Sequence, residues 1–197
     1  MATPTRPRRD GAETRLLARR TALRLFAEQG YEATSLRQIA DELGINKASL
    51  YYHFANKEAI LLSLLDERGE EAGHLLTWLR DQPRTPALLT EAVLRWVDSF
   101  TPDKLQGIRF MSANPVIVRT LVARPGTDRV GPTLTDVVAE LTTLLPDPSP
   151  PNVLLLRMAL LSVNAAVQAA DPALTPDEVI IAAARQSARA VLGDLTR

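Results

Sequence analysis

Apolar residues recur along this chain at spacings of three and four, and no segment alternates apolar and polar residues over more than a few positions. Such spacings place apolar side chains on one face of an α-helix. Proline, which costs about 3 kcal/mol in a helix interior, is absent from the 75 residues between positions 8 and 82. The pattern predicts an all-α protein of about nine helices.

Start and stop signals set the expected bounds of several helices. Ser35 with Gln38 three residues later forms a capping-box pattern, and Gly44 can end that helix with a positive φ. Asn46 and Asn56 are suited to cap the next two helices. Helices are therefore expected over residues 13–29, 36–43, 47–53 and 57–80, and two long ones over about 152–170 and 176–192. The proline-dense segment 146–151 is the one clear loop.

The segment Thr34–Glu58 has the pattern of a helix–turn–helix, in which the second helix enters the DNA major groove. Apolar residues in it are spaced to pack the two short helices against Phe26 of the first helix. They are Ile39, Ala40, Leu43, Ile45 and Leu50. The other residues of the second helix, 47–49 and 51–53, are left to project around its exposed sides.

Charge and composition exclude several classes of protein. The 23 basic and 23 acidic residues balance, but residues 1–57 hold 10 Lys and Arg against 6 Asp and Glu, which favours a polyanionic partner there. The chain has no cysteine and two histidines, so a zinc site is not expected, although carboxylates could still bind a harder ion. We assign no metal site and expect no cofactor. Since we find no secretory signal and no apolar stretch long enough to span a bilayer, we expect a cytoplasmic protein with no membrane partner.

The segment that contains the predicted helix–turn–helix resembles the TetR family of transcriptional regulators. The resemblance covers roughly Leu16–Leu62 and rests on the segments Phe26–Tyr31, Leu50–Phe54 and Lys57–Leu61, together with the Thr-Ser pair at 34–35, the Ile-Ala pair at 39–40 and Gly44. Two positions depart from the family pattern. Ala18 replaces a larger aliphatic residue, and Ala48 stands where glycine is common.

The resemblance implies a DNA-binding role for ten residues. Lys47 and Lys57 would bind phosphates, and Thr34, Ser35, Tyr52 and His53 would donate hydrogen bonds to the DNA backbone. Base readout would fall to Arg37, Ala48, Ser49 and Tyr51. The arginines at positions 6, 8 and 9 lie in an amino-terminal arm that could reach a minor groove.

Each of these roles has a structural alternative. Arg37 could be a solvated helix charge, and Tyr51 could pack in the core of the small domain. His53 could cap its own helix instead of binding phosphate. The arm could be a disordered, solubilising tail. The sequence thus predicts a basic arm over residues 1–12, a DNA-binding domain over 13–56 and a helical ligand-binding and dimerisation domain over 57–197.

The last two helices are expected to form a homodimer interface. Residues 153–170 are apolar nearly all round, which requires burial on every side. The last helix carries a stripe that includes Ala184, Ala188 and Val191, small enough for close approach. Pairing with the same helices of a second copy would make a two-fold four-helix interface, matching two half-sites on double-stranded DNA. The alternative is that both helices belong to the core of one monomer.

A small-molecule site is expected among the remaining helices because the family resemblance implies a ligand. Candidate lining residues are the aromatic, methionine and polar side chains of that region: His74, Trp78, Trp96, Phe100, Phe110, Met111, Met158 and Asn164. Each could equally be an ordinary core residue. Gly69 and Gly73 could soften the fourth helix as a hinge, or simply allow close packing.

The function that follows from these patterns is a homodimeric, sequence-specific repressor that a small-molecule effector releases from a two-fold operator. The alternative is an activator, or a regulator of the same fold that a protein partner controls. We find no Gly-rich phosphate loop, nucleophile elbow or metal-ligand spacing in the sequence, so we do not expect an enzyme.

Overall fold

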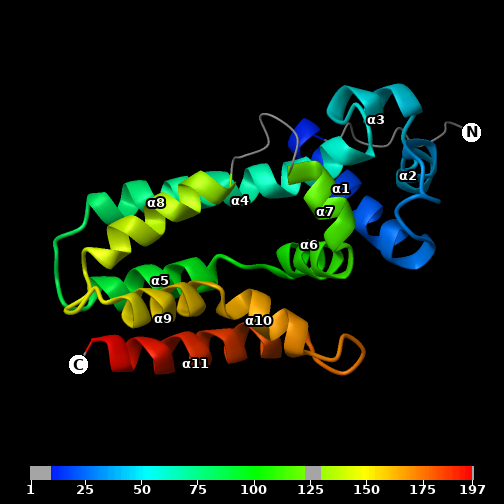
Figure 1. The fold of residues 1–197 in the computed structure, drawn as a ribbon. Coiled ribbons are helices and arrows are strands. Elements are labelled where there is room, and N and C mark those ends of the chain that lie inside the picture. Colours follow the sequence, from blue (N-terminus) through cyan, green and yellow to red (C-terminus); the bar gives the residue numbers. More distant parts are fainter. Residues whose placement is uncertain (1–9, 123–129, 197) are drawn as a thin grey trace, which may run out of the picture. The chain divides into compact units, whose positions relative to one another are not determined.

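The structure is a computed structural model that describes residues 10–122 and 130–196, and these ranges contain eleven α-helices and no strand (Figure 1). The chain divides into two compact units, Met1–Ser63 and Leu64–Arg197. The division falls inside helix α4, Lys57–Arg80, rather than at its start. Ile60 and Leu61 are fully buried, so the first turns of α4 contribute core to the first unit.

The first unit contains α1 (Gly11–Gln29), α2 (Leu36–Leu43), α3 (Lys47–His53) and the start of α4. Its core is built from Phe26, Ile39, Ala40 and Leu50, as the spacing predicts, whereas Leu43 and Ile45 are half-buried. The ring of Phe26 meets that of Tyr31 edge-on, with centroids 4.9 Å apart. Helix α1 begins at Gly11, so the last two residues of the expected arm are helical, and residues 1–9 lie outside the described ranges.

Local capping explains why the short helices start where they do. Ser35 Oγ accepts a hydrogen bond from Gln38 N at 3.2 Å, and Gln38 Oε1 accepts one from Ser35 N at 2.7 Å. Asn46 Oδ1 accepts from Ser49 N and Asn56 Oδ1 from Ala59 N, both at 2.7 Å. Gly44 ends α2 with φ 64° and ψ 35°, the left-handed conformation that glycine adopts readily. The predicted bounds of α2, α3 and α4 are confirmed.

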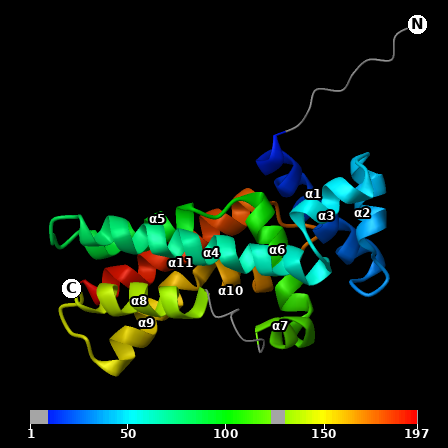
Figure 2. The same cartoon turned by 90° about the horizontal axis from the view of Figure 1, so that it is seen from above.

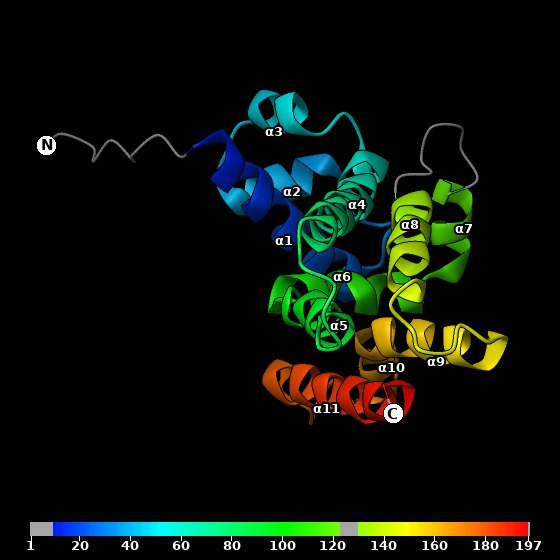
Figure 3. The same ribbon diagram turned by 90° about the vertical axis from the view of Figure 1, so that its left-hand side faces the viewer.

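The second unit contains the rest of α4 and seven further helices. They are α5 (Leu88–Asp98), α6 (Pro102–Ala113), α7 (Pro115–Val122), α8 (Val130–Thr142), α9 (Pro150–Leu160), α10 (Ser162–Ala169) and α11 (Asp177–Leu195). Helix α11 packs along α5, α9 and α10 (Figures 1 and 3). The view from above shows α5 and α11 running along one another (Figure 2). Side chains of α5, α9 and α11, including Val97, Leu156, Ile180 and Ala184, form the buried core.

The long helix expected over residues 152–170 is broken into α9 and α10, which meet at Leu161 with a bend of 59°. Trp96 Nε1 donates a hydrogen bond to the Leu160 carbonyl at the bend, at 3.1 Å. The bend is one reason why the described residues hold more helices than expected. Within them no single helix is long and apolar enough to cross a membrane, and only the bent α9–α10 pair passes that test of length and composition.

Helix α4 runs without interruption through both Gly69 and Gly73. A Cβ atom at Gly73 would lie 3.9 Å from Thr133 Cγ2 of α8, which is ordinary van der Waals contact. The structure therefore records close packing of α4 and α8 at Gly73, and no break in the helix there.

Candidate functional site

Helix α3 presents a surface of polar and aromatic side chains that are not buried in the core of the first unit. Lys47 and Ala48 are exposed, Tyr51 is 44% exposed and Tyr52 is 87% exposed. The Lys47 ammonium lies 5.2 Å from the centre of the Tyr51 ring. Because a tyrosine normally buries its ring, two neighbouring exposed tyrosines on a seven-residue helix form a surface suited to a partner. The exposure of Tyr51 also places it outside the core of this unit.

Arg15 of α1 holds the carboxyl end of α3. Its guanidinium lies 4.7 Å from the centre of the Phe54 ring, and its Nη1 donates to the His53 carbonyl at 3.3 Å. Phe54 is almost fully buried, so it anchors the chain directly after α3. The sequence analysis did not single out Arg15, because its partners lie 38 residues away along the chain. His53 is half-buried and meets the Tyr52 ring edge-on at 5.3 Å.

Two residues that were expected to contact the DNA backbone instead direct their side chains to backbone carbonyl oxygens within the first unit. Thr34 is buried, and its hydroxyl faces the carbonyl oxygens of Gly30 at 2.9 Å and Leu25 at 3.3 Å. Lys57 Nζ donates to the Tyr31 carbonyl at 2.6 Å and to the Glu32 carbonyl at 3.3 Å. Both side chains therefore stabilise the turn between α1 and α2.

The remaining candidates stay at the surface. Arg37 is highly exposed and lies 3.7 Å from Asp41, one helical turn away. Ser35 is also exposed, although its hydroxyl is part of the capping box. Ser49 is half-buried, and its backbone N–H is used by the Asn46 cap. The surface that remains available on α2 and α3 thus centres on Arg37, Lys47 and the two tyrosines.

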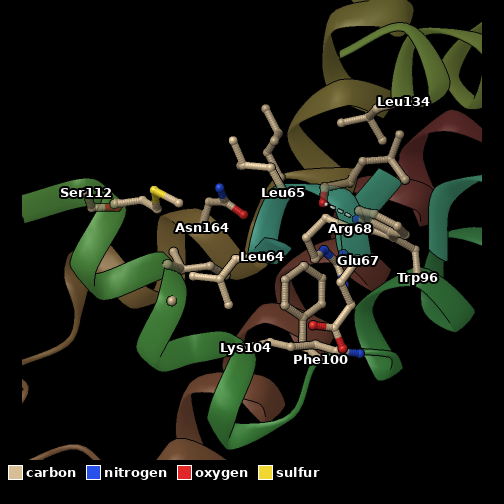
Figure 4. Close-up of a pocket in the computed structure, with 15 residues that line it drawn as sticks. Leu64, Leu65, Glu67, Arg68, Trp96, Phe100, Lys104, Ser112, Leu134 and Asn164 are labelled. Atoms are coloured by element: carbon tan, nitrogen blue, oxygen red, sulfur yellow. Dashed lines mark hydrogen bonds between the residues drawn. The ribbon is translucent and has the colours of Figure 1, made fainter. Parts of the chain in front are cut away.

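The second unit contains a partly open cavity of about 220 Å³. Helices α4, α5, α6 and α8 line it, together with the α9–α10 bend, and most of its wall is apolar (Figure 4). The polar groups in the wall come from Glu67, Arg68, Lys104, Ser112 and Asn164. Apolar pockets with a few polar groups are the usual form of a small-molecule site.

Half of the predicted lining residues are in this wall. Trp96, Phe100, Met111 and Asn164 line the cavity. The other four lie elsewhere: His74 is exposed, Trp78 packs beneath Arg95, Phe110 is buried outside the cavity wall, and Met158 is 53% exposed on α9. Met158 fails as a cavity residue because α9 is not buried on every side.

Arg68 is one of several cavity residues that the sequence did not predict. Its guanidinium lies between two aromatic rings, 4.0 Å from the centre of Trp96 and 3.9 Å from that of Phe100. Burial lowers the pKa of Arg68, against the opposing influence of Glu71 and Glu67. In the sequence this arginine sits among glutamates, a pattern typical of a solvated helix face, so only the fold reveals its position.

Glu71 connects Arg68 of α4 to Lys104 of α6. Its carboxylate accepts from Arg68 Nη1 and forms an ion pair with the Lys104 ammonium. Lys104 Nζ also donates to the Ser99 carbonyl at 2.6 Å. All three charged side chains are more than three-quarters buried, so their pairing is far less screened by water than a surface ion pair.

Comparison with known proteins agrees with the geometry of the first unit. Residues 19–64 match the family model described as bacterial regulatory proteins, tetR family. This segment resembles the DNA-binding domain of the TetR family. The transcriptional regulator YerO of Bacillus subtilis is 52% identical over 44 residues, and IcaR of Staphylococcus epidermidis, a negative transcriptional regulator of the icaADBC biofilm operon, is 54% identical over 39. Both relatives are named as transcriptional regulators, and the matched segment is the one that contains the helix–turn–helix.

The matched segments cover 22% and 20% of this chain, and only 15% of YerO and 21% of IcaR. Solved TetR-family structures extend the likeness of fold over nearly the whole chain. The regulator KstR2 of Mycobacterium tuberculosis has a TM-score of 0.66 at 21% identity, covering 93% of this chain and 95% of KstR2. A SmeT–triclosan complex has a TM-score of 0.60 at 18% identity, covering 92% and 91%. An N-terminal helix–turn–helix followed by a helical domain is therefore the fold of this chain.

Proposed function

We propose that this chain is a homodimeric, sequence-specific transcriptional repressor that acts on DNA in the cytoplasm and leaves its operator when a small molecule binds. The observation that carries the proposal is the exposed face of α3, with Lys47, Tyr51 and Tyr52, within residues that match the TetR family. The name of IcaR, a negative regulator, supports repression. An activator, or a regulator controlled by a protein partner, is the alternative.

The proposed DNA contacts divide into two kinds. Lys47, Ser35, Tyr52 and His53 would contact the sugar-phosphate backbone and position α3 in the major groove. Arg37, Ala48, Ser49 and Tyr51 would read base edges, each correct contact contributing about 1–3 kcal/mol of discrimination. Thr34 and Lys57 would act mainly by holding the unit together, because their polar atoms already have partners within it.

The last helices supply the proposed dimer interface. Leu154, Met158 and Leu161 lie exposed along α9 at 59%, 53% and 47%, and Val179 of α11 is 53% exposed. The stripe predicted for this interface is wrong in part, because Ala184 and Ala188 are fully buried in the core of this chain. The outer face of α11 carries other small residues, among them Ala183 and Ala190, which would permit close approach of a second helix. Exposed apolar stripes of this kind favour association, and a two-fold dimer would bring two copies of α3 to two half-sites.

The ligand is proposed to bind in the cavity of the second unit. A cavity of about 220 Å³ with a charged group in its wall is suited to a small molecule rather than to protein packing alone. The triclosan complex of SmeT supports a small-molecule ligand in a protein of this fold. Release of DNA requires only that the ligand bind more tightly to the conformation of the protein that does not bind DNA. DNA binding must then weaken ligand binding by the same factor.

The experiment is selection of genomic fragments by the purified protein, followed by titration of the best fragment at several salt concentrations. Lys47→Ala should reduce the salt dependence by about one released ion while keeping sequence preference. Tyr51→Ala should relax sequence preference with little change in the salt dependence. Lys57→Met serves as the comparison, because the loss of a cation whose Nζ is already bonded should reduce the salt dependence less than Lys47→Ala.

If the selected fragment has a two-fold symmetric sequence and its binding responds to the variants in this way, the result supports α3 as the DNA-recognition helix. A transcription assay on that fragment, with and without the protein, then separates repression from activation. Binding that remains equally non-specific for the natural protein and both alanine variants would contradict the proposal.

A further inference from the structure

The wall of the cavity contains a hydrogen-bond donor without an acceptor. Arg68 uses Nη1 for Glu71 and, at 3.5 Å, for Ser99 Oγ. Its Nη2 is buried, and no acceptor lies within hydrogen-bond distance among the described residues. A buried guanidinium nitrogen without a partner is costly, and such groups commonly mark the place of an absent ligand, ion or water.

The surroundings of Arg68 favour an anion over a cation. A ligand cation would need an aromatic face, but the faces of Trp96 and Phe100 that meet in this wall are already covered by the guanidinium. The one carboxylate paired with Arg68, that of Glu71, is shared with Lys104. Glu67 also lines the cavity, so acidic and basic groups both stand in its wall. Among the described lining residues, however, the buried polar atom left without a partner is the Arg68 donor, and a carboxylate is the group that its planar guanidinium binds best.

The size of the cavity limits the rest of the molecule. An apolar protein cavity of about 150 Å³ is large enough for benzene. The cavity here, at about 220 Å³, has room for one ring or a short alkyl chain together with a carboxylate. Leu64, one helical turn before Arg68 on α4, and Met111 of α6 offer apolar surface for the body of the ligand. Ser112 and Asn164 are the uncharged polar side chains of the wall (Figure 4).

We propose that the effector of this protein is a small monocarboxylic acid with an apolar body, whose carboxylate binds Arg68. The inference rests on the proposed function, in that it names the class of ligand for the cavity. Binding requires the guanidinium of Arg68 to rotate, so that Nη2, which is buried in this structure, donates to the carboxylate. The apolar body then packs against Leu64 and Met111.

Calorimetric titration of the full-length protein without DNA tests the ligand class. The probes are phenylacetate, phenylacetamide and 2-phenylethylamine, which share a ring and differ in the charge of the head group. Phenylacetate should bind about tenfold or more tightly than phenylacetamide, because a charge-assisted hydrogen bond is replaced by a neutral one, and 2-phenylethylamine should not bind. Equal binding of acid and amide, binding of the amine alone, or no binding of any probe overturns the proposal.

Two variants locate the carboxylate. Arg68→Met should remove the preference for phenylacetate over phenylacetamide, and Arg68→Lys, which retains the cation, should keep part of it. Asn164→Leu is the matched control in the same cavity wall and should leave the preference intact. If Arg68→Met fails to fold, binding of the three probes to Arg68→Lys and to the natural protein still tests whether Arg68 binds the carboxylate. Loss of the preference in Asn164→Leu but not in the Arg68 variants would overturn the assignment of the anchor.

The two proposals fail in different ways. The ligand class is judged by binding to the protein alone, and DNA release by fluorescence anisotropy of the selected operator with phenylacetate added. Arg68-dependent binding of phenylacetate without release of DNA would contradict the proposed mode of regulation and leave the ligand class standing. Release of DNA that the acid and the amide cause equally would overturn the ligand class and support the regulation.

Discussion

Lys57 Nζ lies 2.6 Å from the carbonyl oxygen of Tyr31 and 4.5 Å from the centre of the Tyr31 ring. The ammonium thus joins the start of α4 to the turn after α1, 26 residues earlier in the chain. A lysine at the start of a helix in a DNA-binding domain would ordinarily be assigned to a phosphate. Here its hydrogen bonds within the unit give it a structural role as well.

Lys57→Met should therefore destabilise the DNA-binding domain. The change keeps most of the apolar stem but removes a charge-assisted hydrogen bond, which contributes about 1.5–3 kcal/mol. Urea unfolding should show a loss of about that size. Lys47→Ala, which removes an exposed lysine, should leave the unfolding midpoint nearly unchanged. A lysine at 57 that acts only through phosphate would give the reverse result, an unchanged stability and a reduced salt dependence of DNA binding.

Gly30 and Gly44 should differ in how much stability is lost when a residue with a side chain replaces them. Gly30 has φ 89° and ψ 150°, a region that only glycine occupies readily, while Gly44 has φ 64° and ψ 35°, which asparagine also visits. Gly30→Ala should cost about 1–3 kcal/mol of folding free energy even though no atom lies within 4 Å of the added Cβ. Gly44→Asn should cost less than Gly30→Asn in thermal unfolding, and equal costs would contradict the backbone argument.

Trp96→Phe tests the bend between α9 and α10. The variant keeps an aromatic ring near Arg68 but removes the N–H donor to the Leu160 carbonyl, and a buried carbonyl left without its donor costs about 1–3 kcal/mol. Trp78→Phe is the control, since within the described residues the Trp78 indole N–H has no recorded hydrogen-bond partner. Denaturant unfolding should give Trp96→Phe a clearly lower free energy of unfolding than Trp78→Phe. Equal values would show that the Trp96 hydrogen bond does not stabilise the bend.

Met158→Asp should convert the proposed dimer to monomers. A charge placed in the exposed stripe of α9 would be buried without a partner in the dimer, so the dissociation constant should rise by about a hundredfold or more. Val116→Asp, on α7, is the matched control because Val116 is 70% exposed and lies outside the last three helices. Sedimentation equilibrium measures both variants. A Met158→Asp protein that remains as dimeric as Val116→Asp would place the interface elsewhere.

Gly73→Ala should raise the stability of the second unit. The helix is continuous at this position and the added Cβ makes only ordinary contact with Thr133, so the gain is the difference in helix propensity, about 0.5–1 kcal/mol. Chemical unfolding measures that gain, and a loss would show that the backbone needs glycine there. If Gly69 and Gly73 act as a hinge, replacing both with alanine should also weaken the release of operator DNA by the effector. Unchanged release would contradict the hinge.

The sequence by itself determined the helix–turn–helix, because the signals that define it act over three or four residues. The Ser35–Gln38 capping box, the left-handed Gly44 and the Asn46 and Asn56 caps set helix ends through local hydrogen bonds and backbone sterics, and the structure has those ends. Helical periodicity likewise identified Phe26, Ile39 and Leu50 as core.

Tertiary structure alone decided which polar and apolar side chains remain available for function. Thr34 and Lys57 are occupied by carbonyl oxygens up to 26 residues away, and Trp96 supports a bend 64 residues further along the chain. Arg68 lines a cavity although glutamates surround it in the sequence, and Met158 is exposed although it lies in a largely apolar stretch. Local patterns specify helices because helical hydrogen bonds are local, whereas burial and pairing depend on which distant helices the fold brings together.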